Sequence, residues 1–184
     1  ELSKRELTER VMEDWFALLN LGKRMAATGS SDSHRIQYQW AGYPRTYAIL
    51  DARAAGDTGQ PIDVREVVAA LKKGRSFVTS GPIIELDLTA AGQRARPGDE
   101  LPRTGALGGR LRVRAAPWID VTSVQIVAGL PAVPPSPGST VTLFESAIPS
   151  RPTQIEREEG SLDELQARTI RFETELSLEP PLEA

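Results

Sequence analysis

Arg110-Leu111-Arg112-Val113-Arg114 is the stretch that decides the fold, because charged and apolar side chains alternate along it. Successive side chains of a β-strand point to opposite faces of the sheet. The alternation therefore predicts a strand with Leu111 and Val113 on its buried face and three arginines in water. These arginines are expected to form the wet face of one strand rather than a basic stripe that binds nucleic acid.

Period-two alternation recurs along the chain after residue 82. It is present at residues 84–88, 124–126 and 170–176, and Gly/Pro-rich connections such as residues 130–138 separate these runs. Several short alternating strands joined by turn residues are typical of two packed antiparallel sheets. We therefore expect residues 83–184 to form an antiparallel β-sandwich-like module. The charge-dense residues 155–168 are expected to be a solvated loop or a short exposed helix.

Residues 1–82 follow a helical period instead. Leu7, Val11, Trp15, Leu18 and Leu19 recur on one helix face, with capping-box spacing between Ser3 and Glu6 and a stop signal at residues 20–22.

A second helix is predicted over residues 64–71. Asp63 caps it and Gly74 ends it. Residues 24–28 and 76–79 have the length and composition of short strands. The chain is therefore predicted to be α+β, with an α/β unit at residues 1–82.

Composition excludes several classes of function. The net charge is −3 without a basic patch, which gives no reason to expect nucleic-acid binding, and no apolar run reaches bilayer length. Cysteine is absent, so disulfides and thiol redox chemistry are excluded. The polar first residues lack an initiator Met, and we expect the chain to begin inside a longer protein.

Asp32 and His34 are the candidate metal ligands. His34 is the only histidine, and both residues follow the turn cluster Gly29-Ser30-Ser31. A carboxylate and an imidazole two residues apart reach one ion from a single loop and suit Zn, Mn or Fe. A catalytic site needs at least three protein ligands and an open position, so further ligands are required. In the alternative interpretation, Asp32 caps a turn and His34 is a surface side chain.

Arg45 is the candidate substrate contact. It lies in the segment Gly42-Tyr43-Pro44-Arg45-Thr46-Tyr47, and its planar guanidinium suits an anionic or carbonyl oxygen. The alternative is a turn anchored by aromatic packing, with Arg45 in an ion pair.

Four segments together resemble a known family, by their order and spacing. They are Asp14–Asn20, Thr28–His34, Gly42–Arg45 and Leu71–Pro82. They are similar to the carboxy-terminal part of the CehA/McbA-like metallohydrolases of the PHP (polymerase and histidinol phosphatase) superfamily. The resemblance implies that residues 1–82 are a partial PHP-type βα barrel segment, in front of the β module. It also implies that the family's last metal motif, Asp-x-His, corresponds to Asp32 and His34.

The family's earlier metal motifs, including a His-x-His pair, do not occur in this chain. The resemblance therefore implies a carboxy-terminal fragment of a metal-dependent hydrolase, inactive alone. The intact enzyme would hydrolyse a small-molecule phosphoester, amide or carbamate by metal-bound hydroxide. The missing amino-terminal half of the barrel, or self-association, would cover Trp15, Leu18, Val67 and Leu71. The alternative is a non-enzymatic β-sandwich binding or structural module with a relic metal motif.

Overall fold

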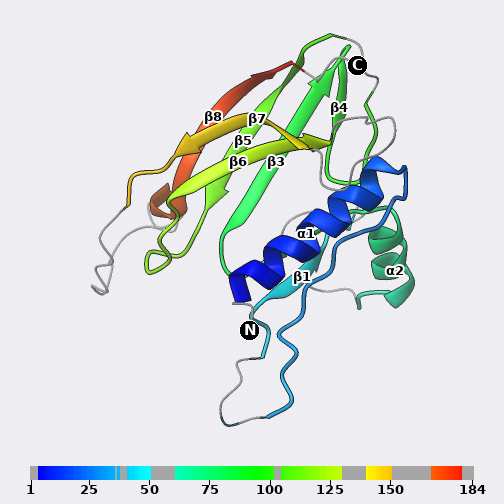
Figure 1. Ribbon diagram of the computed structural model, residues 1–184, viewed down its shortest axis with the longest axis vertical. Coiled ribbons are helices and arrows are strands. Elements are labelled where there is room, and N and C mark those ends of the chain that lie inside the picture. The colour runs from blue at the N-terminus through cyan, green and yellow to red at the C-terminus, as the bar shows by residue number, and fades with distance from the viewer. Residues whose placement is uncertain are drawn as a thin grey trace.

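Antiparallel sheets dominate the protein in its computed structural model (Figure 1). The structure describes residues 4–35, 37, 41–50, 61–101, 105–129, 140–150 and 167–179. The predicted mixed α+β class with mainly antiparallel pairing is confirmed. The elements are α1 (Lys4–Asn20), β1 (Arg45–Ala48), α2 (Val64–Lys72), β2 (Ser76–Thr79), β3 (Ile83–Ala90), β4 (Gln93–Ala95), β5 (Leu107–Arg114), β6 (Ser123–Gly129), β7 (Thr140–Ala147) and β8 (Ile170–Leu178).

The largest sheet is built around β5, in the order β4-β3-β5-β8. All of its pairs are antiparallel, and Leu111 of β5 lies opposite Leu86 of β3 and Thr174 of β8. Strands β6 and β7 form a separate two-stranded sheet, which crosses in front of the larger one in Figure 1.

A hydrophobic core is shared by these two sheets. Leu111 and Val113 are each only 1% exposed. The other buried members of this core come from both sheets and the loop that follows β7: Val124, Ile148, Leu176 and Leu178. Two sheets around one core fit the sandwich-like module predicted after residue 82.

The opposite face of the large sheet carries a ladder of ion pairs. Arg112 donates to Glu173 on β8 at 2.7 and 2.9 Å and to Glu85 on β3 at 3.4 Å. Arg114 donates to Glu85 at 3.0 Å, and Arg110 pairs with Glu173. The arginines of β5 therefore form the wet face of the strand, as the alternation predicts.

Both predicted helices are present, and each ends where its sequence signal lies. The α1 helix closes at Gly22, which has a φ of 74°, and the Lys23 N–H donates to the Leu18 carbonyl at 2.9 Å. Asp63 caps α2 by accepting a hydrogen bond from the Arg65 N–H at 2.8 Å. The capping-box residue Ser3 lies outside the described residues, as do residues 130–138 and most of residues 155–168.

The strand predicted at residues 24–28 does not form. Its backbone bonds to side chains rather than to a neighbouring strand. The Met25 carbonyl accepts from the Trp15 indole at 2.8 Å, and the Gly29 backbone, one residue beyond the run, bonds to Thr46. The partner of β2 is instead β1, in antiparallel register. Asp32 and His34 therefore follow an irregular segment, and not the strand that residues 24–28 were predicted to form.

Large apolar side chains on both helices are exposed. Val11 is 67% and Val64 is 73% exposed, and Met12, Leu18 and Val68 are also on the surface, whereas Trp15, Val67 and Leu71 are half-buried. One antiparallel strand pair and two helices fit more than one architecture, so the barrel interpretation of residues 1–82 stays a prediction. Within the described part of the chain, no helix has the length and apolarity that spanning a bilayer requires.

Replacing Leu111 with Ala should lower the free energy of unfolding by about 2–5 kcal/mol, because it leaves a cavity at the centre of the core. Urea denaturation followed by circular dichroism measures this. The matched control, Leu21→Ala, removes the same atoms from a side chain that is 53% exposed and should cost about 0.5 kcal/mol or less. Equal losses in the two variants would contradict the placement of the core.

The ion-pair ladder should make stability depend on acid pH. Hydrogen bonds from Arg112 and the charge of Arg110 hold the pKa of Glu173 below its ordinary value. A carboxyl whose pKa is lowered by folding stabilises the fold above its unfolded pKa, and this contribution is lost as the pH falls through the folded pKa. Glu173→Gln should therefore lower the Tm near neutral pH and flatten its fall below pH 5. Glu13→Gln on α1 is the control and should leave the dependence of the Tm on pH unchanged. If the Tm of Glu173→Gln falls with pH in parallel with that of the unmodified chain, the claim is contradicted.

Candidate metal site

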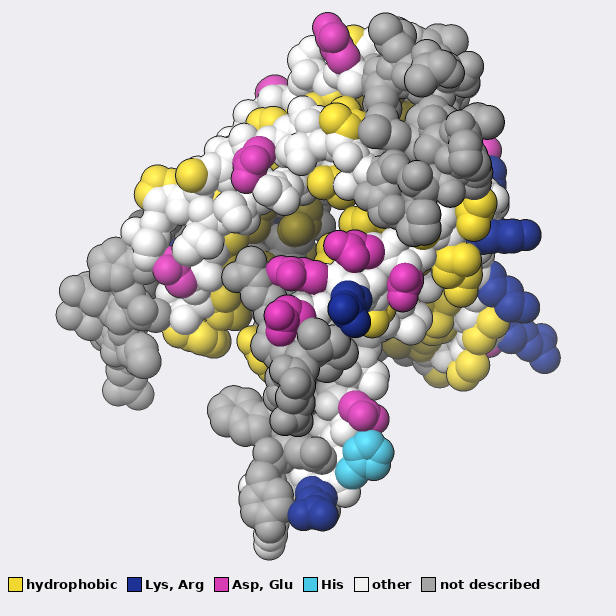
Figure 2. All heavy atoms as spheres, viewed as in Figure 1, with side chains coloured by type: hydrophobic (Ala, Val, Ile, Leu, Met, Phe, Trp, Pro, Cys, Tyr) yellow, Lys and Arg dark blue, Asp and Glu magenta, His cyan; other side chains and the backbone are white. Residues whose placement is uncertain are grey.

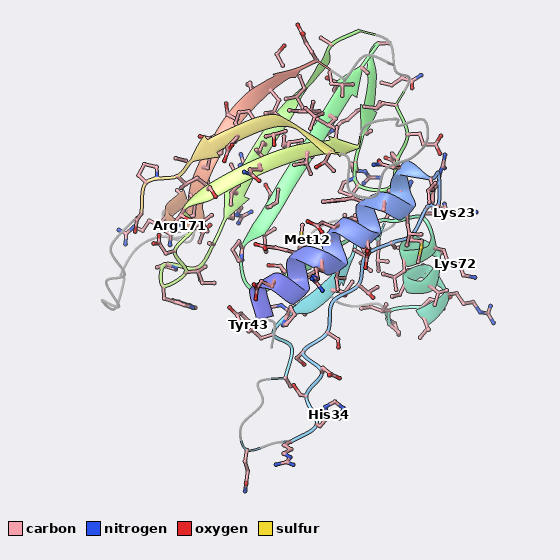
Figure 3. All side chains as sticks on the ribbon, in the orientation of Figure 1. Met12, Lys23, His34, Tyr43, Lys72 and Arg171 are labelled. Carbon is pink, nitrogen blue, oxygen red and sulfur yellow. The ribbon has the colours of Figure 1, made fainter. Side chains whose placement is uncertain are left out.

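The segment between α1 and β1 carries the candidate ligands away from the sheets. Figure 3 shows His34 on this projecting segment, and Figure 2 shows the histidine beside an acidic side chain, open to solvent. The side chains of Asp32 and His34 are 87% and 71% exposed. Asp32 has a φ of 50°, in the left-handed region that Asp tolerates better than most residues. Both candidates are therefore accessible from outside the chain.

Asp32 and His34 lie side by side, as predicted. His34 Nε2 is 3.6 Å from Asp32 Oδ1, and His34 Nδ1 is 2.7 Å from the Asp32 carbonyl oxygen. A carbonyl only accepts hydrogen bonds, so Nδ1 must carry a proton. In the neutral ring Nε2 is then the nitrogen with the lone pair, and it is the ring atom 3.6 Å from Asp32 Oδ1. Histidine ligands of metals commonly use this arrangement, with the other ring nitrogen donating to a carbonyl or carboxylate.

The spacing of the two donor atoms fits a shared ion. Ligand atoms about 2.0–2.2 Å from a tetrahedral ion are about 3.4 Å apart. The observed 3.6 Å between Nε2 and Oδ1 is close to that value. The residues present therefore fit one divalent ion, with a hard oxygen and a borderline nitrogen as donors.

A third ligand is not provided by the described residues, among which no three His, Cys, Asp or Glu side chains gather closely enough to hold an ion. If Asp32 and His34 hold an ion, the remaining ligands must come from outside the part of the chain that the structure describes. The same two residues also fit the alternative of a capped turn with a surface histidine.

Arg45 anchors the turn that precedes β1. It donates to the Gly42 carbonyl at 3.0 Å and to the Tyr47 hydroxyl at 3.1 Å, and its guanidinium lies 5.6 Å from the centre of the Tyr47 ring. Tyr47 in turn stacks on Phe77 of β2, with ring centres 5.0 Å apart. These contacts match the aromatic packing of the alternative, but among the described residues the partners of Arg45 are a carbonyl, a hydroxyl and a ring rather than the carboxylate of an ion pair. The role of Arg45 in substrate binding stays a prediction.

Sequence reasoning missed the side chains that hold this segment in place. The Thr46 hydroxyl bonds to Gly29, and the Ser31 hydroxyl accepts from the Gly42 N–H at 3.1 Å. Thr46 follows Arg45 in the segment at residues 42–47, in which the sequence identified only Arg45 as a candidate. Its partner is 17 positions away, and no periodic signal connects the two.

Comparisons with known proteins give no relative for this chain: no family model matches it, and neither a curated protein nor a solved structure is significantly similar. The geometry of Asp32 and His34 is therefore the main evidence for a function.

The ring of His34 should be in the Nδ1–H form when neutral, because Nδ1 donates to the Asp32 carbonyl. Long-range ¹H–¹⁵N NMR spectra distinguish the two ring nitrogens by their ¹⁵N shifts, and a single histidine gives a single set of signals. A neutral ring found mainly in the Nε2–H form would contradict the described contact.

Proposed function

We propose that this chain contributes Asp32 and His34 to the divalent metal centre of a hydrolase. The single observation that carries the proposal is the arrangement of the pair, in which Nε2 and Oδ1 are 3.6 Å apart and the carbonyl of Asp32 orients the ring. The ion would be Zn, Mn or Fe, and the remaining ligands would come from outside the described residues. The resemblance of residues 10–90 to the carboxy-terminal part of PHP metallohydrolases supports the same proposal.

A bound divalent ion supplies Lewis-acid activation of water and of the bond to be cleaved. The contribution of this chain is to hold that ion, through one carboxylate and one imidazole. Candidate substrates are small phosphoesters, amides and carbamates, which all present an oxygen that becomes more negative during hydrolysis. Arg45 uses Nη1 to bond to Gly42 and Nε to bond to Tyr47, so Nη2 would be the group that contacts such an oxygen.

The proposed partner is the remaining part of the barrel, which would cover the apolar surface of α1 and α2. Val11 and Met12 on α1 and Val64 and Val68 on α2 are all more than 40% exposed. Exposed apolar surface of this kind is typical of an interface. A second copy of the chain is the other occupant of this surface that the proposal allows.

A non-enzymatic module is the second candidate function, and one observation favours it. The β module has its own core, formed by residues of β3, β5, β6, β7 and β8 and adjoining loops, and none of the described side chains of α1 or α2 belongs to it. Such a module could bind or stabilise a partner without chemistry, and Asp32 and His34 would then be a relic.

Zinc should bind to the chain at Asp32 and His34, but weakly, because two ligands alone hold an ion poorly. Titration of Zn²⁺ followed by the NMR signals of the His34 ring should give a saturable shift. Asp32→Asn should weaken the binding about tenfold or more, as expected for the loss of a ligand, whereas Asp14→Asn on α1 should not. Tight one-to-one binding would show that the chain holds further ligands, and no saturable shift would refute the metal proposal.

The chain alone should not hydrolyse phosphoester or carboxylester test substrates, because catalysis requires a firmly held ion with an open position. A longer protein that includes the remaining ligands should show chelator-sensitive turnover, and His34→Ala should remove most of it. Chelator-sensitive turnover by the present chain, lost in His34→Ala, would contradict the fragment proposal. A longer protein without turnover would favour the non-enzymatic module.

A further inference from the structure

We propose that the hydroxyl groups of Thr46 and Ser31 are positioning groups for the Asp32–His34 pair. Neither hydroxyl would bind the ion. Thr46 holds the backbone of Gly29, three residues before Asp32. The Ser31 hydroxyl holds Ser31 itself, the residue directly before Asp32. This inference rests on the proposed function, because the arrangement of the pair matters chemically only if the pair binds a metal.

Thr46 holds Gly29 through both of its backbone groups. The Gly29 N–H donates to Thr46 Oγ1 at 2.8 Å, and Thr46 Oγ1 donates to the Gly29 carbonyl at 2.9 Å. One half-buried hydroxyl thus acts as both acceptor and donor. It satisfies the two backbone groups of Gly29 that a neighbouring strand would otherwise bond to. The irregular segment before Asp32 is therefore fastened to β1 without being a strand itself.

The cross-strand partner of Thr46 completes this clamp. Thr46 of β1 lies opposite Val78 of β2, and the backbone of Gly29 passes so close to Val78 that a Cβ at residue 29 would overlap its side chain. Gly29 is therefore required for close approach. It is held by the hydroxyl of one strand and packed on the valine of the other.

Ser31 forms a second connection, between the same segment and the turn before β1. Its hydroxyl oxygen accepts from the Gly42 N–H at 3.1 Å and from the Ser33 hydroxyl at 2.9 Å. Gly42 is itself held by Arg45, whose guanidinium donates to its carbonyl at 3.0 Å. Ser31, directly before Asp32, is thus tied to the turn before β1, and Ser33, directly after Asp32, is tied to Ser31.

These contacts lower the cost of ordering the ligands. Asp32 and His34 lie in an irregular and highly exposed segment, and fixing such a backbone costs conformational entropy. If the hydroxyl groups fix it in advance, a metal does not have to, and its affinity rises. Removing either hydroxyl should therefore weaken metal binding although every donor atom is retained.

The test compares Zn²⁺ affinities by NMR titration of the His34 ring in the unmodified chain and in four variants. Thr46→Val keeps the shape and removes both bonds to Gly29, and Ser31→Ala removes the bond to Gly42. Each should weaken binding about tenfold, the lower end of the range for groups that orient metal ligands. Thr46→Ser retains the hydroxyl and should bind like the unmodified chain. Thr142→Val makes the same replacement at an exposed position of β7 and should also have no effect.

A second measurement separates positioning from general stability. In metal-free protein, Thr46→Val should move the neutral His34 ring from the Nδ1–H form toward a mixture of both forms, because the contact with the Asp32 carbonyl loosens. Loss of stability alone would lower the Tm and leave the ring of the folded chain unchanged. If Thr46→Val does not fold, Ser31→Ala decides the question, because Ser31 lies outside the hydrophobic core and the loss of its hydroxyl should leave the fold intact. Thr46→Ser then serves as the control.

The outcomes separate this inference from the proposed function. If the unmodified chain binds zinc at His34 and the folded Thr46→Val and Ser31→Ala variants bind equally well, the positioning role is wrong and the metal site stands. If the unmodified chain gives no saturable shift, the metal site is wrong, and the positioning role is overturned with it.

Discussion

The alternation along β5 constrains both faces of the large sheet. On one face of β5, Arg110, Arg112 and Arg114 pair with carboxylates. On the other face, Leu111 and Val113 lie in the core and are each 1% exposed. A shift of register by one residue would bury three guanidinium groups and expose two core side chains, so the register is strongly specified. Strands β3 and β8 contribute the opposing acids, Glu85 and Glu173, and the same register brings their apolar side chains into the core.

The candidate site depends on this sheet through a short series of contacts. The turn after β4 packs on the turn between α2 and β2: Asp99 accepts a hydrogen bond from Arg75 at 3.1 Å, and Gly98 lies directly against the backbone at Lys73. Strand β2 pairs with β1, and β1 holds Gly29 through Thr46. The projecting segment with the candidate metal-ligand pair is thereby attached to a regular strand at Gly29, in addition to its contact with the turn before β1 through Ser31. Sites supported by regular elements are held more accurately than sites on loops alone.

Local patterns in the sequence predicted most of the elements, but not the contacts that support the site. Helices α1 and α2 carry clear caps and periodicity, and β3, β5, β6 and β8 alternate strictly enough to be predicted as strands. Strand β7 was not predicted, because buried and exposed side chains do not alternate regularly along it. Its pairing with β6 shifts register between Ile126 and Val127. The candidate pair Asp32 and His34 was predicted from residue type and spacing. The clamp between Gly29 and Thr46 was not, because a hydroxyl that bonds to a backbone 17 residues away leaves no periodic trace.

The central claim is that Asp32 and His34 bind one and the same ion, and a crystal of this chain soaked in zinc tests it most directly. Anomalous diffraction at the zinc absorption edge locates the ion without reference to the protein atoms. The account predicts a peak about 2.0–2.2 Å from both His34 Nε2 and an Asp32 carboxylate oxygen, the usual distances for zinc with these ligands. Zinc bound elsewhere, with the Asp32 and His34 side chains turned apart, would contradict it.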